Sequence, residues 1–299
     1  MTAASAVGFL LVDKPQGWTS HDVVAKVRNL LGMKKVGHAG TLDPMATGLL
    51  VLGLGRATRL LRFVQETEKE YVARAQFGVA TDSLDADGSV LSRAPMEIGQ
   101  DDLEPVLERF RGSILQVPPM VSARKVEGRR LYELAREGRE VEREARPVTI
   151  YSLELTDFAP SDYPQVEFLV RCSKGTYVRT LADDMARALG GRAHLTELRR
   201  TRNGGLSVAD AHSVESIAGA AAEGEWQRLV LDPLDGLPDL PLVEVDAEVA
   251  QAVGNGVPLA GSVLAGVDSG CVRVAGPERR LLGVYRVEGS RAVPEVVIS

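Results

Sequence analysis

Apolar residues recur at helical spacing in three segments of the chain. Between Ser20 and Gly32, valines and leucines fall three or four positions apart, which places them on one face of a helix. Ser20 is a suitable N-cap residue and Gly32 a suitable C-terminal stop, so the sequence predicts a helix between them. Similar apolar stripes, each followed by a glycine, predict helices over residues 103–110 and 181–189.

Other segments alternate apolar and polar residues with a period of two, the pattern of a half-buried strand. Residues 71–79 and 166–172 show this alternation, and the apolar run Leu49–Leu54 has the length of a buried strand. Helices and strands are interleaved without the regular rhythm of a doubly wound fold. The pattern therefore favours the α+β class over a parallel α/β sheet.

Two segments interrupt this organisation. The stretch 232–241 (DPLDGLPDLP) is rich in proline, aspartate and glycine, a composition typical of a domain boundary. It predicts one domain over about residues 1–235 and a small β-rich domain over 240–299. Residues 124–146 alternate arginine, lysine and glutamate with few large apolar groups, which predicts an exposed helical excursion.

The composition is ordinary for a globular protein, with 44% hydrophobic and 25% charged residues. No apolar run approaches the roughly 18 residues that a membrane helix needs, and the N-terminus lacks the basic start of a signal peptide. Cys172 and Cys271 lie far apart in the sequence, which predicts neither a disulfide framework nor a zinc site and fits a reducing cytoplasm. The four histidines are scattered and predict no metal cluster.

The net charge of −6 argues mildly against nucleic acid as a partner. Local basic surfaces, rather than net charge, nevertheless decide contact with phosphates. Basic residues gather in the segments 26–35, 56–62 and 199–202. Each segment could be solvated surface or part of a nucleic-acid interface, and the charge pattern alone leaves both open.

The segment Gly37–Leu50 (GHAGTLDPMATGLL) is the most informative for chemistry. Pro44 pushes the backbone of Asp43 towards extended geometry, and three glycines permit tight bends around it. The sequence therefore predicts a carboxylate displayed on a stiff loop before a buried strand. A plain turn aspartate, common in Asp-Pro pairs, is the alternative on these grounds.

Two further segments resemble ligand-binding motifs but lack residues that those motifs require. GLGRAT (53–58) lacks the third glycine of a dinucleotide loop and the lysine of a P-loop. DSLDADG (82–88) has the aspartates of a calcium loop, but its twelfth position would be Ala94 instead of a glutamate. A hairpin turn is the better interpretation of that segment, and no credible cofactor motif remains.

Five segments, in order along the chain, resemble motifs of the TruB family of pseudouridine synthases. The segment around Asp43 resembles the catalytic motif of that family. The other segments are DKPQGWTS (13–20), KEY (69–71), PPMVSARKVEGRRLYELAR (118–136), and CSKGTYVRTLADDMARALG with AHLTELRR (172–200). Together they span nearly all of residues 8–205, and five matches in order make the resemblance specific.

The resemblance implies a mixed, mainly antiparallel sheet flanked by helices, with a cleft across one face. It also implies an RNA-binding insertion over about 118–146 and a C-terminal RNA-binding domain of the PUA or PUA-like type, where a generic small β domain is the alternative. The activity it implies is isomerisation of the uridine at position 55, in the TΨC loop of tRNA, to pseudouridine. The family needs no cofactor and no metal, and nothing in the sequence requires more than a monomer.

Individual residues match the family's functional positions. Asp43 matches the nucleophile, Tyr71 the active-site tyrosine and Arg179 the arginine paired with the catalytic carboxylate. The positions that line the target nucleotide are His38, Tyr177 and Leu198. The residues expected to contact RNA are Lys14, Arg124, Lys125, Arg129, Arg130, Arg199 and Arg200.

These residue types suit the reaction, in which an N–C glycosidic bond is replaced by a C–C bond. A carboxylate can hold a covalent intermediate, and a guanidinium beside it favours its ionised form. Tyr71 could stack on the extruded uracil and take its C5 proton. Taken singly, Arg179 could be a surface arginine and Tyr71 a half-buried strand residue. A non-catalytic RNA-binding protein on the same scaffold is the alternative, and it would tolerate loss of Asp43.

Overall fold

The computed structural model describes residues 6–120, 125–126, 129–130, 141–263, 267 and 269–298. Within these residues a ten-stranded sheet has the order β14-β1-β3-β12-β4-β11-β10-β7, with β2 paired to β3 and β13 to β12. The β1–β14 and β3–β12 pairs are parallel and the other pairs are antiparallel. The predicted α+β class, with a mixed and mainly antiparallel sheet, is confirmed.

The strands of this sheet are β1 (Gly8–Lys14), β2 (Val36–His38), β3 (Thr47–Leu54), β4 (Lys69–Phe77), β7 (Gly112–Gln116), β10 (Arg146–Ala159), β11 (Gln165–Cys172), β12 (Ala193–Asn203), β13 (Leu206–Ser207) and β14 (His212–Ser213). The helices in this part of the chain are α1 (Ser20–Leu31), α2 (Leu61–Glu66), α3 (Gln100–Phe110), α5 (Val178–Ala188) and α6 (Val214–Ala222), with short 3₁₀ turns η1 (Gly55–Arg59), η2 (Val208–Asp210) and η3 (Trp226–Leu229). A separate two-stranded sheet joins β5 (Val79–Thr81) to β6 (Val90–Arg93).

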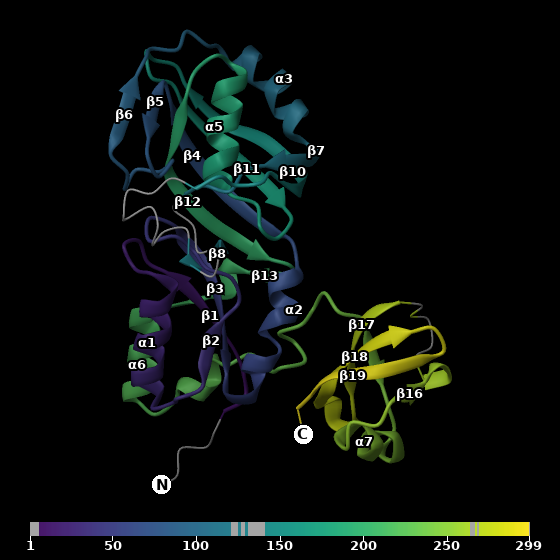
Figure 1. Ribbon diagram of the computed structural model, residues 1–299. Coiled ribbons are helices and arrows are strands. Elements are labelled where there is room, and N and C mark those ends of the chain that lie inside the picture. The colour runs from purple at the N-terminus through teal and green to yellow at the C-terminus, as the bar shows by residue number, and fades with distance from the viewer. Residues whose placement is uncertain are drawn as a thin grey trace.

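Helices cover the sheet in two pairs. In Figure 1, α1 and α6 lie side by side against the half of the sheet that contains β1, whereas α3 and α5 cover the half that contains β10 and β11. Val23 and Val27 of α1 and Leu181 and Met185 of α5 are buried, on the apolar faces that the periodicity predicts. The amphipathic pattern therefore determines which face of each helix meets the sheet.

The helix predicted from Ser20 is present as α1, but its N-cap is Thr19. The Thr19 hydroxyl accepts a hydrogen bond from the Asp22 N–H at 3.1 Å, and the Asp22 carboxylate accepts one from the Thr19 N–H at 2.8 Å. This capping box satisfies two backbone donors of the first turn, so the predicted cap was wrong by one residue. Gly32 ends the helix in the left-handed conformation, as predicted.

Two other elements differ from prediction at their ends. Helix α3 begins at Gln100 and its C-cap is Arg111, because Gly112 already belongs to β7. Strand β4 stops at Phe77, and Gly78, with φ of 82°, turns the chain into β5. The apolar alternation continues across this turn, which is why the sequence predicts one strand instead of two.

The predicted helical excursion over 124–146 lies mostly outside the described residues. Where the structure describes this segment, Lys125–Val126 (β8) pairs with Arg129–Arg130 (β9) in an antiparallel hairpin. Strand β10 then begins at Arg146. For these described residues the prediction of helix was wrong, because the charged pattern carries no signal for a two-residue hairpin.

The C-terminal part of the chain forms a second sheet of five strands, in the order β15-β17-β18-β19-β16. Its elements are β15 (Leu242–Glu244), α7 (Ala247–Gly254), β16 (Leu259–Ala260), η4 (Gly261–Val263), β17 (Gly270–Ala275), η5 (Pro277–Arg279), β18 (Leu281–Glu288) and β19 (Arg291–Val297). It follows the Pro- and Asp-rich stretch at which the sequence places a domain boundary. Within the described ranges, no helix is long and apolar enough to cross a membrane.

Candidate active site

Asp43 lies on the loop between β2 and β3. Its neighbours Leu42 and Met45 are each only 3% exposed, so they anchor the loop in the core. The Ala46 N–H donates to the Asp43 carbonyl at 3.1 Å, and the Gly17 N–H donates to the Pro44 carbonyl at 2.8 Å. The Asp43 side chain itself is 35% exposed. The loop therefore presents a carboxylate from a firmly held turn, the geometry that the glycines and proline predict.

Gly48 allows the start of β3 to approach β12 closely. Its φ is 96°, and a Cβ at this position would lie 2.3 Å from the Arg200 carbonyl oxygen. Only glycine tolerates both the positive φ and this contact. The approach sets Arg200 against the loop that carries Asp43.

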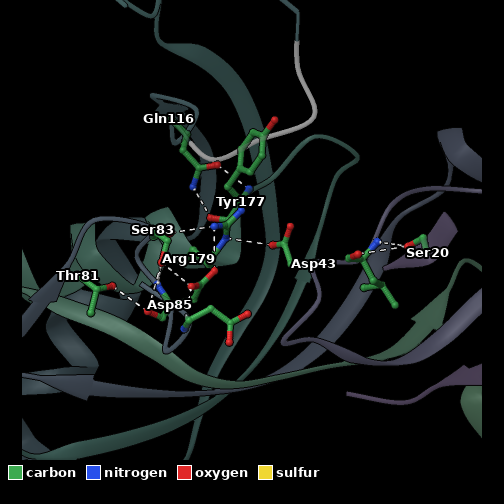
Figure 2. A network of polar contacts seen from close by, with 10 residues as sticks. Ser20, Asp43, Thr81, Ser83, Asp85, Gln116, Tyr177 and Arg179 are labelled. Carbon is green, nitrogen blue, oxygen red and sulfur yellow. Dashed lines mark hydrogen bonds and ion pairs between the residues drawn. The ribbon is translucent and has the colours of Figure 1, made fainter. Parts of the chain in front are cut away.

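Arg179 meets Asp43 from the first turn of α5. The Arg179 Nε lies 3.0 Å from Asp43 Oδ2, although the two residues are far apart in the sequence (Figure 2). The Arg179 side chain is only 3% exposed. A guanidinium in this position can hold the carboxylate in a fixed orientation and favour its charged form.

Asp85 is a second carboxylate on the same guanidinium, and no motif in the sequence singles it out. The Arg179 Nη1 lies 3.0 Å from Asp85 Oδ2 and donates to the Ser83 carbonyl at 2.8 Å. Asp85 accepts from the Ser83 hydroxyl at 2.5 Å and from the Asp87 N–H at 3.2 Å. The segment DSLDADG does form a turn, as predicted, and its buried aspartate also fixes Arg179.

Opposing effects act on the ionisation of Asp43. Burial raises the pKa of Asp43 above the ordinary value for aspartate. The positive charges of Arg179 and Lys14 lower this pKa, and the negative charges of Asp85 and Asp87 raise it. The net direction is upward, so ionisation of Asp43 near neutral pH depends on the guanidinium beside it.

Tyr71 lies on β4, between β11 and β12, where it pairs with Val170 on one side and Arg200 on the other. Burial raises the pKa of Tyr71, and the charge and hydrogen bond of Arg200 lower it. The negative charge of Asp43 also raises the pKa of Tyr71. Leu198 is buried nearby on β12, opposite Ala73 of β4.

His38 and Tyr177 flank the two partners of the ion pair. His38 ends β2, just before the loop of Asp43, and its buried Nδ1 has no hydrogen-bond partner among the residues that the structure describes. Burial lowers the pKa of His38, which favours the neutral ring. Tyr177 is the N-cap residue of α5, two positions before Arg179. The structure thus brings the six residues matched to the catalytic and nucleotide positions to neighbouring elements.

Two residues expected to contact RNA lie inside the protein. Lys14 is 0% exposed, and its ammonium donates to the carbonyls of Pro15, Trp18 and Pro44 at 3.0, 2.6 and 3.3 Å. Burial lowers the pKa of Lys14 to about 8. The Arg200 side chain donates to the carbonyls of Leu49 and Gly40 at 2.7 and 3.3 Å. Both cations hold the backbone around Asp43, so the expectation that they contact phosphates is corrected.

The other basic residues expected to contact RNA lie on β12 and in the segment 124–130. Arg199 is partly exposed and forms a two-pronged ion pair with Asp13, at 3.0 and 2.7 Å. The backbones of Lys125, Arg129 and Arg130 form the β8–β9 hairpin. Arg124 lies outside the described residues. Among the residues that the structure describes, no group of three histidine, cysteine or acidic side chains could hold a metal ion.

Family models match most of the chain. Residues 28–178 match the N-terminal domain of the TruB family pseudouridylate synthases, and residues 179–237 match the tRNA pseudouridylate synthase B C-terminal domain. Together these matches contain Asp43, Tyr71 and Arg179.

Curated relatives and a solved structure agree with these matches. The chain is 46% identical over 94% of its length to tRNA pseudouridine synthase B of Moorella thermoacetica, of which it covers 94%. It is 50% identical over 85% of its length to the enzyme of the same name from Symbiobacterium thermophilum, of which it covers 84%. A chain in a crystal structure of a Cbf5-Nop10-Gar1 complex superposes with a TM-score of 0.78 at 26% identity, over 98% of this chain and 85% of the other. The protein therefore belongs to the TruB family of pseudouridylate synthases.

Proposed function

We propose that this enzyme isomerises the uridine at position 55, in the TΨC loop of tRNA, to pseudouridine, with Asp43 as the nucleophile and without a cofactor. The observation that carries the proposal is the contact of 3.0 Å between Asp43 and Arg179. It joins a partly exposed carboxylate to a buried guanidinium, which is the arrangement expected of a positioned, ionised nucleophile. The tRNA substrate is the one that the names of the relatives state for those proteins.

The proposed reaction needs a carboxylate and a proton acceptor. Asp43 forms a covalent bond to the ribose or to the base while the bond between N1 of uracil and C1′ of ribose breaks. The base then rotates and a bond forms between C5 and C1′. The covalent bond to Asp43 breaks and returns its electron pair to the carboxylate, the C5 proton leaves and N1 gains a proton, so the product is an isomer of the substrate and the enzyme is regenerated. Tyr71 stacks on the base, and its hydroxyl relays the C5 proton by accepting it while passing its own proton to water. Burial raises the pKa of Tyr71, so the phenol stays protonated between turnovers, and the charge of Arg200 lessens that rise.

The target uridine has to leave the stacked loop of the tRNA, at a cost of a few kcal/mol. His38, Tyr177 and Leu198 surround the extruded nucleotide in this proposal. Arg199 and the β8–β9 hairpin, which carries Lys125, Arg129 and Arg130, bind the phosphates of the arm. Arg124 and the C-terminal sheet extend the same RNA surface.

The proposal includes a monomeric enzyme in the cytoplasm. Both cysteines, Cys172 and Cys271, are free thiols. Free thiols fit a reducing compartment. The ion-paired residues Asp43, Asp85 and Arg179 all come from one chain, so a second copy is not needed to complete the site.

A tritium-release assay tests the function. The enzyme is incubated with tRNA transcribed from uridine labelled with tritium at C5, since isomerisation releases the label to water. We expect release from a normal transcript and none from a transcript with cytidine at position 55. Asp43→Asn is expected to abolish release while tRNA binding survives, and Asp101→Asn, on the exposed first turn of α3, is the matched control. Normal release by Asp43→Asn contradicts the assignment, and tRNA binding by the wild type without any release supports a non-catalytic RNA-binding protein.

A further inference from the structure

Gln116 holds both backbone polar groups of one residue beside the active site. Its side-chain NH₂ donates to the Tyr177 carbonyl at 3.0 Å, and its side-chain carbonyl accepts from the Tyr177 N–H at 2.7 Å. Gln116 is only 2% exposed and is the last residue of β7. Figure 2 shows its side chain in contact with the backbone of Tyr177. We call this pair of hydrogen bonds the Gln116 clamp.

Ser20 makes the equivalent contact on the other side of the ion pair. Its hydroxyl accepts from the Leu42 N–H at 2.8 Å and donates to the Leu42 carbonyl at 3.2 Å. Ser20 is also 2% exposed, and it is the first residue of α1. We call this the Ser20 clamp. A side chain that satisfies both polar groups of one peptide residue fixes the position of that residue in two directions.

The two clamped residues lie next to the ion-paired residues. Leu42 immediately precedes Asp43, and Tyr177 is the N-cap of α5, two positions before Arg179. The Tyr177 side chain makes no cap hydrogen bond, so its backbone position depends on the bonds that its N–H and C=O make. Ordinary satisfaction of buried polar groups explains why these bonds exist. It does not explain why both lie within two residues of the two ends of one ion pair.

We propose that Ser20 and Gln116 are positioning residues, whose clamps set the separation of Asp43 and Arg179 before the substrate arrives. Neither side chain touches the reacting atoms in this proposal, which rests on the proposed function of the site. The clamps join elements that are distant in the chain: α1 to the loop of Asp43, and β7 to α5. Preorganisation of this kind raises the rate because the charged partners need no rearrangement when the reaction begins.

The kinetic test uses variants that remove each clamp with little change of shape. Ser20→Ala deletes the hydroxyl and Ser20→Thr keeps it; Gln116→Met deletes both hydrogen bonds and Gln116→Glu keeps the acceptor. We expect Ser20→Ala and Gln116→Met to lower the single-turnover rate of tritium release roughly 10- to 100-fold. Affinity for tRNA should change by less than about threefold, because neither variant removes a contact that binds the substrate and the transition state equally. Ser20→Thr and Gln116→Glu should recover part of the rate.

A pH profile distinguishes positioning from general support of the fold. The charges that face Asp43 are Arg179 from α5, Lys14 from β1, and Asp85 and Asp87 from the turn after β5. Loss of a clamp loosens Arg179 from Asp43, so the acid limb of the rate should move to higher pH. The control is Thr19→Ala, which removes the cap of α1 and so lowers stability but touches neither partner of the ion pair. It should leave both the rate and the acid limb unchanged.

Crystal structures of Ser20→Ala and Gln116→Met complete the test independently of activity. The distance from Arg179 Nε to Asp43 Oδ2 is expected to lengthen beyond hydrogen-bonding range, from 3.0 Å. An unchanged distance overturns the clamp proposal, and so does a rate loss no larger than that of Thr19→Ala. Absence of tritium release by the wild type overturns the proposed function instead, while the distances still decide whether the clamps position the pair.

Discussion

Removal of the guanidinium of Arg179 is the most direct perturbation of the site. Arg179 binds Asp43 and Asp85, each at 3.0 Å, and the Ser83 carbonyl at 2.8 Å, and its side chain is 3% exposed. Arg179→Met keeps much of the length of the side chain but removes the charge and the donors. Arg179→Lys keeps the charge, but a single ammonium cannot replace the planar fork that binds two carboxylates at once.

Two magnitudes follow from this geometry. Asp85 is only 6% exposed and loses its charged partner in Arg179→Met, and breaking a buried pair in this way costs roughly 3–5 kcal/mol. The remaining hydrogen bonds from Ser83 and Asp87 favour the lower end of that range. The nucleophile also loses its orienting partner, which is expected to lower the single-turnover rate by about 100-fold or more. Arg179→Lys should fall between the wild type and Arg179→Met in both measurements.

The pH dependence gives a sign that can be checked. Asp43 must be ionised to act, so the rate falls as the pH drops through the Asp43 pKa. Arg179 lowers that pKa, so Arg179→Met should move the acid limb of the rate to higher pH. Urea unfolding measures the loss of stability. Tritium release under single-turnover conditions, recorded as a function of pH, measures the position of the acid limb of the rate.

The matched control is Arg187→Met, on the same helix. Arg187 is 57% exposed and pairs with Asp183, which keeps Arg192 as a second partner. This change should cost at most about 1 kcal/mol and leave the pH profile unmoved. An Arg179→Met enzyme with a rate within threefold of the wild type and an unshifted acid limb refutes the assigned role of the guanidinium.

Three further predictions concern the loop of Asp43. Gly48→Ala, which forces a Cβ to within 2.3 Å of the Arg200 carbonyl at positive φ, should lower the free energy of unfolding by about 1–3 kcal/mol, measured by urea titration. Lys14→Met removes a donor from the Pro15, Trp18 and Pro44 carbonyls, of which Pro44 keeps the Gly17 N–H. Stability should therefore fall by about 1–3 kcal/mol while filter-binding affinity for tRNA stays unchanged, and a weaker affinity without loss of stability indicates a phosphate contact instead. Burial raises the Asp43 pKa in the folded protein, so the protonated Asp43 stabilises the fold at low pH and this contribution is lost as the pH rises through that pKa. Asp43→Asn has no such titration and should therefore gain stability relative to the wild type as the pH rises from 4 to 7. A constant difference in the free energy of unfolding across that range contradicts the raised pKa.

The sequence predicts local structure well where the pattern and the environment agree. Helix α1 and strand β11 follow from periodicity, because each buries one face against a single layer. Asp85 could not be predicted in the same way. The turn that contains it was correctly predicted, but its charge has a role only because Arg179 arrives from 94 residues along the chain. Periodicity describes residues that are close in the sequence, so it gives no information on the contact between Asp85 and Arg179.

The basic residues show a second limit. Lys14 and Arg200 look like surface charges in the sequence, yet each is buried and donates to backbone carbonyls of other segments. Arg199, the neighbour of Arg200, points to the partly exposed side of β12 instead. Because successive side chains of a strand point to opposite faces of the sheet, these two arginines must lie on different faces. The sequence does not show which face is covered by other parts of the chain, so it does not show which arginine is buried.

Burial of these cations has a consequence for the chemistry of the loop. The backbone around Asp43 turns too sharply to pair with a neighbouring strand, so its carbonyls need other donors. Lys14 donates to Pro44 beside the Gly17 N–H, and Arg200 donates to Gly40 of the loop and to Leu49 of the adjoining strand β3. The same Lys14 charge lowers the pKa of Asp43, and the Arg200 charge lowers that of Tyr71. A neutral donor could satisfy the carbonyls equally well, but it would leave the nucleophile to rely on Arg179 alone against the cost of burial. Lys14 therefore contributes to the shape of the loop and to the ionisation of Asp43 at the same time, whereas Arg200 contributes to that shape and lowers the pKa of Tyr71.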